Sequence, residues 1–342
     1  MGQQEFQDSQ KLLNERGLPT NFGWARSPLW AYDRRLILVR KHRIVESERY
    51  VLLAEDKIVL IEVVQQGFIS YVSVSVVDLI LKKAWSDYFP FLFPLGMFSG
   101  SPTPSGNLYK IRDKRLLLDI NVLENGNRVI KIDIPRFNHG KGLRGMVVMI
   151  RPPFPEALAT VSPWRKKPHC FRYSYAAPWY ALEGVIRHGE EDLVFYKDHS
   201  WAVLLWDRGL NPAHDIHYWS CAAGITKGSQ VSLSLGYGLM NAEYGTENAF
   251  FINGSLQKIQ QVTFKISPKS WMEPWILTSD DQRLTLRFTP VAETRLTRKR
   301  IFQSIRQTTF FGFFQGVYTS ENNEVFELNK IPGVAWREKV RL

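Results

Sequence analysis

Apolar and polar residues alternate in many short segments along this chain. Successive side chains of a β-strand point to opposite faces, so this alternation predicts strands with one buried face. The segments are 57–64 (KIVLIEVV), 68–77 (FISYVSVSVV), 115–123 (RLLLDINVL), 128–134 (RVIKIDI), 200–206 (SWAVLLW), 230–238 (QVSLSLGYG), 256–266 (LQKIQQVTFKI), 283–291 (RLTLRFTPV) and 312–319 (GFFQGVYT). They are rich in β-branched and aromatic residues. The pattern predicts an all-β protein of antiparallel barrels or sandwiches with few short helices.

Two Asn-Gly pairs stand between alternating segments, at Asn125-Gly126 and Asn253-Gly254. Tight hairpin turns need positive φ angles, which Asn and Gly tolerate. We therefore predict a β-hairpin at each pair.

Two segments depart from the strand pattern. Residues 6–17 (FQDSQKLLNERG) carry the best helical signal, with Gly17 and Pro19 as stop signals, and predict a short helix or a frayed arm. Residues 89–107 (FPFLFPLGMFSGSPTPSGN) contain four prolines and predict a long aromatic-rich loop. Such a loop either covers a cavity mouth or packs on the outside of a barrel.

The length of 342 residues, with 44% apolar and 13% aromatic content, suits one large core or two ordinary ones, and we expect two domains. The 44 Lys and Arg residues against 33 Asp and Glu give a formal charge of +11. This charge fits a soluble basic protein, or one that contacts an anionic membrane surface. The basic residues cluster most closely at Arg295, Arg298, Lys299 and Arg300. No long Lys/Arg tract is present, so no specific nucleic-acid partner is expected.

Several function classes are excluded by missing motifs. The two cysteines, Cys170 and Cys221, are too few for a disulfide framework, and the N-terminal stretch lacks the apolar core of a signal peptide, so a cytoplasmic location is expected. There is no Gly-rich phosphate loop between a strand and a helix, no Gly-x-Ser-x-Gly and no His-Glu-x-x-His. Kinase, dehydrogenase, esterase and zinc-protease functions are excluded, and no cofactor is expected.

Five segments together resemble the domain of unknown function 2804 family. They are NFGWARSPLWAYD (21–33), LLWDRGLNPAHDIHYWSCAAG (204–224), SLSLGYGLMNAEYGTENAFFING (232–254), PWILTSDDQRLTLRFTPV (274–291) and FGFFQGVYTSENNEVFELNKIPGVAWREKVR (311–341). The order and spacing of these aromatic and glycine-rich segments make the resemblance specific. It extends from about Gly17 to the end of the chain.

More distantly, the chain is similar to tandem lipocalin-like proteins, which include carotenoid 1,2-hydratases of the hydroxyneurosporene synthase type and cyclases of polyketide-type substrates. This resemblance implies two antiparallel β-barrel-like halves, with a small apolar ligand inside a barrel or at the junction. We assign residues 1–17 to an N-terminal arm or short helix, 18–205 to the first lipocalin-like domain and 206–342 to the second. The chain departs from the sequence motifs of those relatives at Asp207, where a glycine is usual, and at Asn241, where an acidic residue is expected.

The segment WDRG at 206–209 supplies the candidate acid, Asp207. A hydratase needs a proton donor beside an apolar pocket and aromatic faces that stabilise positive charge. Asp207 could donate only if burial kept it protonated. Arg208 is its neighbour, but adjacent strand residues point to opposite faces. The alternative is a salt bridge that fixes the junction between the halves. The aromatic and cationic residues expected around the ligand are Trp206, Arg208, Tyr218, Trp219 and Tyr237.

Two further groups are candidate ligand contacts. Glu247 and Asn248 precede a hairpin strand and either bind a polar head or cap a turn. His214 and His217 resemble half of a metal site, but on a strand their spacing places them on opposite faces, so no metal is expected. Trp24 and Arg26 either form a cationic aromatic rim, together with Trp30, or plug a barrel end.

We interpret the chain as a binding protein for a hydrophobic or amphipathic, lipid-like small molecule. The alternative is a cofactor-independent hydratase, isomerase or cyclase acting on an isoprenoid or polyketide-like substrate. A third hypothesis is binding to an anionic surface through the basic cluster.

Overall fold

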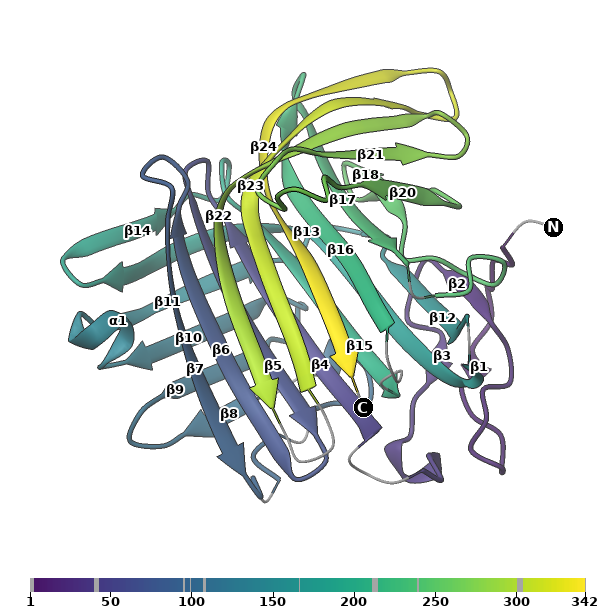
Figure 1. Cartoon of the computed structure of the whole chain (residues 1–342), viewed down its shortest axis with the longest axis horizontal. Coiled ribbons are helices and arrows are strands. Elements are labelled where there is room, and N and C mark those ends of the chain that lie inside the picture. The colour runs from purple at the N-terminus through teal and green to yellow at the C-terminus, as the bar shows by residue number, and fades with distance from the viewer. Residues whose placement is uncertain are drawn as a thin grey trace.

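The computed structural model describes residues 3–39, 43–94, 96–98, 100–106, 109–165, 167–210, 215–238, 240–299 and 304–341. Over these ranges the chain forms two large curled sheets that pack on each other, and their neighbouring strands are antiparallel (Figure 1). The predicted all-β class and the two barrel-like halves are confirmed. None of the helices in the described ranges is long and apolar enough to cross a membrane.

The first sheet has thirteen strands within the described ranges. Its main path runs through β7 (Lys83–Leu92), β6 (Ile69–Asp78), β5 (Lys57–Gln66), β4 (Ile44–Leu53), β15 (Trp201–Leu210), β13 (Lys167–His188), β11 (Leu143–Ile150), β10 (Arg128–Ile134), β9 (Leu117–Val122) and β8 (Tyr109–Arg112). Beside this path, β12 (Leu158–Trp164) and β14 (Glu191–Phe195) pair with β13, and β2 (Gly23–Ala25) pairs with β12.

The second sheet has nine strands within the same ranges. Their order is β19 (Ser255–Lys258), β18 (Ala249–Ile252), β17 (Ser229–Tyr237), β16 (Asp215–Thr226), β24 (Val325–Arg341), β23 (Ser304–Thr319), β22 (Leu284–Lys299), β21 (Trp275–Ser279) and β20 (Val262–Lys265). The chain changes sheet between β15 and β16, whereas the domain boundary predicted at residue 206 lies inside β15. Strand β15 therefore forms part of the wall between the two halves.

Both Asn-Gly hairpins form as predicted. Asn125-Gly126 joins β9 to β10, and Asn253-Gly254 joins β18 to β19. The φ angles of Asn253 and Gly254 are 49° and 81°, which are the positive values that the turn requires.

The N-terminal arm contains no helix over residues 3–17 and ends in a turn at residues 15–17. It contributes β1 (Gln10–Lys11), which pairs in parallel with β3 (Trp30–Ala31). Leu12 and Leu13 are both buried in an aromatic cluster at this end of the first sheet. Of the two alternatives predicted for this segment, the structure shows an arm and not a helix, because the arm obtains its hydrogen bonds and its apolar contacts from tertiary partners. The described ranges include the short helical segments α1 (Phe137–Gly140), η1 (Arg34–Leu36) and η3 (Pro104–Gly106).

The long loop predicted at residue 89 begins only after Leu92. Residues 89–92 belong to β7, where Pro90 is tolerated because β7 is the edge strand of its sheet. Beyond it, Phe98 is buried against Phe91, with ring centroids 5.1 Å apart. The described part of the loop therefore turns inward and closes the first half-barrel.

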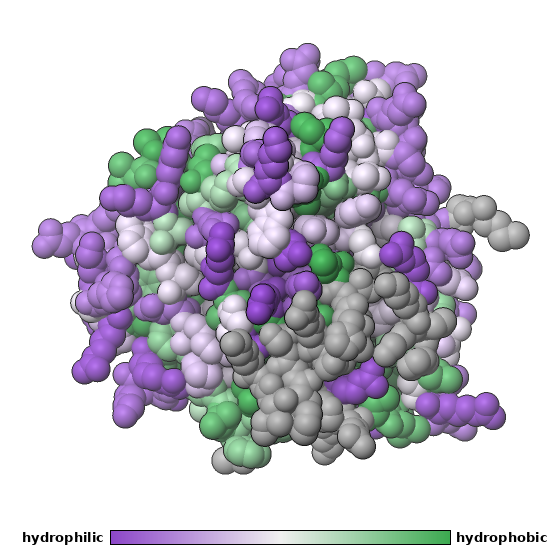
Figure 2. Space-filling model, viewed as in Figure 1, coloured by the Kyte–Doolittle hydropathy of each residue, from purple (hydrophilic) through white to green (hydrophobic). Residues whose placement is uncertain are grey.

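The surface facing the viewer in Figure 2 is mostly hydrophilic, with apolar residues scattered among polar ones. The apolar side chains gather instead in the two half-barrels and in a layer between the sheets. That layer includes Val203 and Leu205 of β15, Trp219 of β16 and Trp336 of β24.

Candidate functional site

Strand β15 separates two buried charged groups. Trp206 and Arg208 point into the first half-barrel, whereas Asp207 faces the second sheet, as the alternation along a strand requires. Trp206, Asp207 and Arg208 are each at most 2% exposed. The predicted separation of the Asp207 and Arg208 side chains is therefore confirmed.

We call Arg208, Glu48, Tyr50 and Tyr109 the barrel group. Glu48 Oε1 accepts hydrogen bonds from Arg208 Nη2 at 2.9 Å and from Tyr109 Oη at 2.8 Å, and Oε2 accepts from Tyr50 Oη at 2.8 Å. Arg208 also donates to the backbone carbonyls of Ser47 and Ser101. Both charges of this group are thus paired and hydrogen-bonded, as buried charges generally must be.

We call Asp207, Arg49, Arg172, His217 and Glu247 the interface group, because it lies between the two sheets. Asp207 Oδ2 accepts from Arg49 Nη1 at 3.1 Å, and Arg172 Nε lies 3.6 Å from Oδ1. Burial raises the pKa of Asp207 above its usual range, although both arginines oppose that shift. Arg49 continues the group toward Glu62 on β5, which it contacts at 2.8 Å.

Three segments of the chain bring Arg172, His217 and Glu247 together. Arg172 comes from β13, His217 from β16, and Glu247 from the connection between β17 and β18. Arg172 Nη1 lies 3.3 Å from His217 Nδ1, and His217 Nε2 lies 3.4 Å from Glu247 Oε2. Gly236 of β17 makes this approach possible, because a Cβ there would lie 2.9 Å from Glu247 Oε2.

The protonation of the pair follows from its neighbours. A guanidinium can only donate, so His217 Nδ1 accepts from Arg172 and the ring proton sits on Nε2, facing Glu247. Burial opposes the ionisation of Glu247, but His217 and Arg172 outweigh it and lower the pKa of Glu247 to about 2. The site therefore presents an imidazole N–H donor next to a carboxylate acceptor.

His217 and Glu247 line a cavity of about 210 Å³ at one end of the second half-barrel. Neither Glu247 oxygen accepts a hydrogen bond of good geometry from the described residues, and Arg172 Nη1 is 4.0 Å from Oε1. The other lining residues are Arg165, Gly236, Tyr237, Gly238, Met240, Ala242, Thr246, Asn248, Gln261, Val262 and Thr263. Asn248 is held in place by Gly236, whose backbone N–H donates to Asn248 Oδ1 at 2.7 Å.

The structure thus brings Tyr237, Glu247 and Asn248 to one cavity. Asp207 belongs to the same charged group but does not line this cavity; beside it is a void of only about 10 Å³, roughly the space of one water molecule. Its role as the acid stays a prediction.

The other predicted ligand contacts lie elsewhere. Trp206 packs against Tyr173 at 5.1 Å, Trp219 stacks near Trp336 at 5.4 Å, and Tyr218 packs beside Trp275 at 6.1 Å. Trp24 is buried at one end of the first sheet, and Trp30 lies in the nearby aromatic cluster.

Arg26 lies at the same end as Trp24 and ties three segments together. It pairs with Glu5 at 2.9 Å and Glu156 at 2.8 Å, and donates to the Leu256 carbonyl. The Arg26 guanidinium also lies over the Trp24 ring, 5.5 Å from its centroid, and the choice between a rim and a plug stays a prediction. Arg26 lines a cavity of about 390 Å³ as well.

The basic cluster is not a uniform surface patch. The Arg298 side chain is only 9% exposed, because it packs over the Tyr71 ring and lies 3.7 Å from Glu338, whereas Arg295 is 68% exposed and pairs with Glu293. Arg300, the Lys299 side chain and His214 lie outside the described residues.

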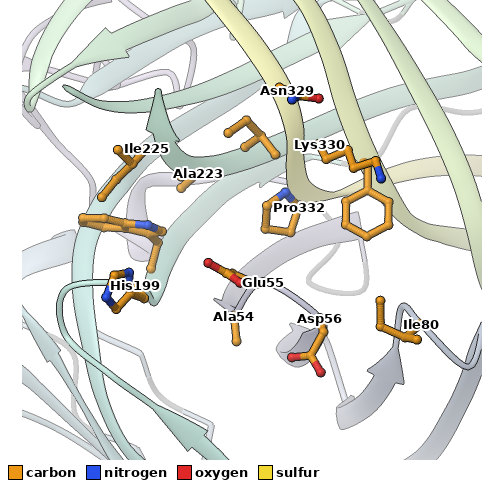
Figure 3. Close-up of a pocket in the computed structure, with 14 residues that line it drawn as sticks. Ala54, Glu55, Asp56, Ile80, His199, Ala223, Ile225, Asn329, Lys330 and Pro332 are labelled. Atoms are coloured by element: carbon orange, nitrogen blue, oxygen red, sulfur yellow. The ribbon is translucent and has the colours of Figure 1, made fainter. Parts of the chain in front are cut away.

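A larger cavity of about 480 Å³ lies at the opposite end of the sheet interface (Figure 3). Ala223 and Ile225 of β16 and Pro332 of β24 line it from the second sheet, and Glu55 and Asp56 from the β4–β5 turn. Its wall is mainly apolar, and none of the site residues predicted from the sequence lines it.

Two residues of the site were not recognised in the sequence. Arg172 carries no local signal, because its partners are 35 or more residues away along the chain. His217 was considered only as a metal ligand, since its approach to Glu247 depends on the missing side chain at Gly236.

Comparison with known proteins agrees with the fold. A family model described as "Domain of unknown function (DUF2804)" matches residues 3–342. No curated protein sequence matches significantly. The chain is similar in structure to a Nitrosomonas europaea protein provisionally assigned as AttH, with a TM-score of 0.52 and 13% identity over 88% of this chain and 93% of that one. It also resembles kievitone hydratase from Nectria haematococca, with a TM-score of 0.48 and 12% identity over 86% and 88% of the two chains.

Proposed function

This chain belongs to the DUF2804 family, and we propose that it binds a small amphipathic molecule in the His217–Glu247 cavity and transfers a proton on that molecule. The observation that carries the proposal is the pairing of a donor and an acceptor at 3.4 Å on the wall of a cavity, with both carboxylate oxygens of Glu247 left without a good hydrogen bond. A buried carboxylate is normally saturated with donors. The donors around Glu247 are only loosely placed: His217 Nε2 lies at 3.4 Å, and the Ser174 hydroxyl also acts on this carboxylate. Its oxygens therefore have capacity to accept a proton from a ligand.

The distance between the two groups also favours this role. A strong N–H···O⁻ hydrogen bond is about 2.7–2.9 Å long, whereas His217 Nε2 and Glu247 Oε2 are 3.4 Å apart. Catalytic hydrogen bonds are often long before a substrate binds. A hydroxyl or carbonyl group of the ligand could therefore accept from His217 while an adjacent C–H or O–H faces Glu247.

We infer isomerisation or dehydration as the reaction classes. In dehydration, Glu247 would accept the proton from a carbon next to a carbonyl, while His217 Nε2–H donates a hydrogen bond to the carbonyl oxygen as negative charge develops there. The electrons of the broken C–H bond form the new C=C bond, and the C–O bond of the β-hydroxyl breaks. Glu247 passes its proton to the departing hydroxyl, which leaves as water, so both groups end as they began. Asp207 would act only through Arg172, as a positioning residue.

The first experiment is to purify the protein from its own source, identify bound molecules by native mass spectrometry and organic extraction, and return them to the protein in D₂O or H₂¹⁸O. Proton transfer predicts deuterium in the recovered molecule, and dehydration run in reverse predicts ¹⁸O. Glu247→Gln should slow this exchange about 10²- to 10⁴-fold, the usual contribution of a general acid or base. Glu243→Gln is the matched control, because Glu243 is an exposed acid in the same connection.

The result that would contradict the proposal is a retained molecule that exchanges equally in the wild type and in Glu247→Gln, or not at all. The larger cavity of Figure 3 then becomes the site of a second candidate function, binding without chemistry. In that case Ile225→Trp, which fills the larger cavity from a half-exposed position, should release the molecule while Glu247→Gln retains it.

A further inference from the structure

A third cavity, of about 390 Å³, lies at the ends of β9, β10 and β11 in the first half-barrel. It shares no lining residue with the His217–Glu247 cavity or with that of Figure 3. Its walls come from Val122 and the β9–β10 turn, from Arg151 after β11, and from Tyr175, Trp179 and Tyr180 of β13.

Arg128 on this wall is a buried cation that makes no ion pair with the described residues. It is 2% exposed; its Nε donates to Tyr180 Oη at 3.3 Å and its Nη2 donates to the Pro104 carbonyl. Its Nη1 has no hydrogen-bond partner among the described residues, and no carboxylate of those residues lies within 4.0 Å of it. Buried Glu48 acts on Arg128 electrostatically, but its carboxylate is already hydrogen-bonded to Arg208. A buried guanidinium with an unpaired N–H group is costly, so Arg128 can take an anion of its own.

The rest of the wall indicates what kind of anion would fit. Trp179 and Tyr180 form an aromatic surface, with ring centroids 4.4 Å apart, and Val122, Pro155 and Ala157 extend the apolar part. The volume lies within the range of small-molecule sites, which are mostly apolar with a few polar groups.

The charges of the wall limit the charge of the ligand. Arg151 is an exposed cation whose side chain packs against Gly126. A Cβ added at Gly126 would lie only 2.6 Å from Arg151 Cδ. Arg26 is already paired with Glu5 and Glu156, and Glu124 lies on the same wall. This balance favours a single negative charge over a dianionic phosphate. We propose that the cavity binds an amphipathic monocarboxylate, whose carboxylate pairs with Arg128 and whose apolar body lies against Trp179 and Tyr180.

The test uses dodecanoate and 1-dodecanol, which share an apolar chain and differ in charge. Binding is measured by calorimetry on the full chain. It is also measured by the part of the tryptophan fluorescence change that is lost in Trp179→Phe, because Trp179 lines the cavity and is one of 11 tryptophans. Dodecanoate should bind at least tenfold more tightly than dodecanol, and Arg128→Gln should remove about 10- to 100-fold of the dodecanoate affinity, as expected for a hydrogen bond to a charged group.

A matched control is Arg187→Gln, which removes an exposed arginine paired with Asp192 far from this wall and should not change binding. Circular dichroism checks that Arg128→Gln is folded; if it is not, Arg151→Glu decides the question, because its side chain is exposed and charge reversal there should weaken dodecanoate but not dodecanol. Equal affinity for the two probes, or wild-type dodecanoate binding in the folded Arg128→Gln or in Arg151→Glu, overturns the proposal. Since the lining residues differ, this result is independent of any obtained with Glu247→Gln.

Discussion

The barrel group and the interface group lie on opposite faces of β15, and each contains a buried glutamate beside a buried arginine, but they differ in how completely their polar atoms are paired. In the barrel group, both Glu48 oxygens accept hydrogen bonds from tyrosine or arginine. In the interface group, Glu247 is equally buried but meets His217 and Arg172 only at 3.4 and 4.0 Å. A fully paired buried charge fixes the fold, whereas an incompletely paired one beside a cavity remains available for a ligand. The difference separates structural from functional charges within one protein.

The largest effect should come from breaking the barrel group. Glu48→Gln removes the counter-charge of buried Arg208 and places an amide N–H₂ among donors, so we expect the free energy of unfolding to fall by about 3–5 kcal/mol. Urea unfolding followed by fluorescence measures it. Tyr50→Phe serves as a milder companion and should cost about 1 kcal/mol for one hydrogen bond. A loss below about 1 kcal/mol in Glu48→Gln would erase the distinction between the two groups.

A smaller effect is expected for the same substitution in the interface group. Glu247→Gln should lower the free energy of unfolding by about 2–3 kcal/mol at pH 7, because the interactions that lower the pKa of Glu247 are lost. The pKa of Glu247 is lowered from 4.5 to about 2, so its stabilising contribution is present above about pH 4.5 and is lost as the pH falls toward 2. The stability difference between wild type and variant should therefore shrink over that interval. A difference that stays constant from pH 5 to 2 would show that the charge of Glu247 is not the cause.

The smallest effect is expected at Asp207. Burial raises its pKa while Arg49 and Arg172 oppose that shift, so the cost and the gain of the charge nearly offset each other. Asp207→Asn should change the free energy of unfolding by about 1 kcal/mol or less and should retain most of the deuterium exchange that Glu247→Gln loses. Complete loss of exchange in Asp207→Asn would instead support Asp207 as the acid.

The sequence predicts the fold well where local pattern and tertiary structure agree. Strands β5 and β6 follow from alternation, and the Asn253-Gly254 turn from the backbone preferences of those two residues. The N-terminal segment forms an arm and not a helix, because Leu12 and Leu13 pack against residues that are distant along the chain. Its local sequence pattern contains no information about those partners.

The site is less accessible to sequence reasoning for a related reason. Glu247 and Asn248 stand out in an unusual segment, but their partners His217 and Arg172 lie on other strands. Their meeting depends on Gly236 having no side chain and on the connection after β17 crossing toward the first sheet, where Thr160 donates to the Thr246 carbonyl. Neither the role of Gly236 nor the path of this connection can be predicted from the spacing of residues along the chain.

The position of Pro90 on β7 also affects how the protein behaves among other copies of itself. An edge strand normally offers a continuous row of N–H and C=O groups that a second molecule can extend into a fibre. Pro90 supplies no N–H, and its carbonyl is already taken by Arg115 Nη2 at 3.2 Å. The largest sheet of the molecule therefore ends in a strand that resists self-assembly, which is a form of protection against aggregation at high concentration.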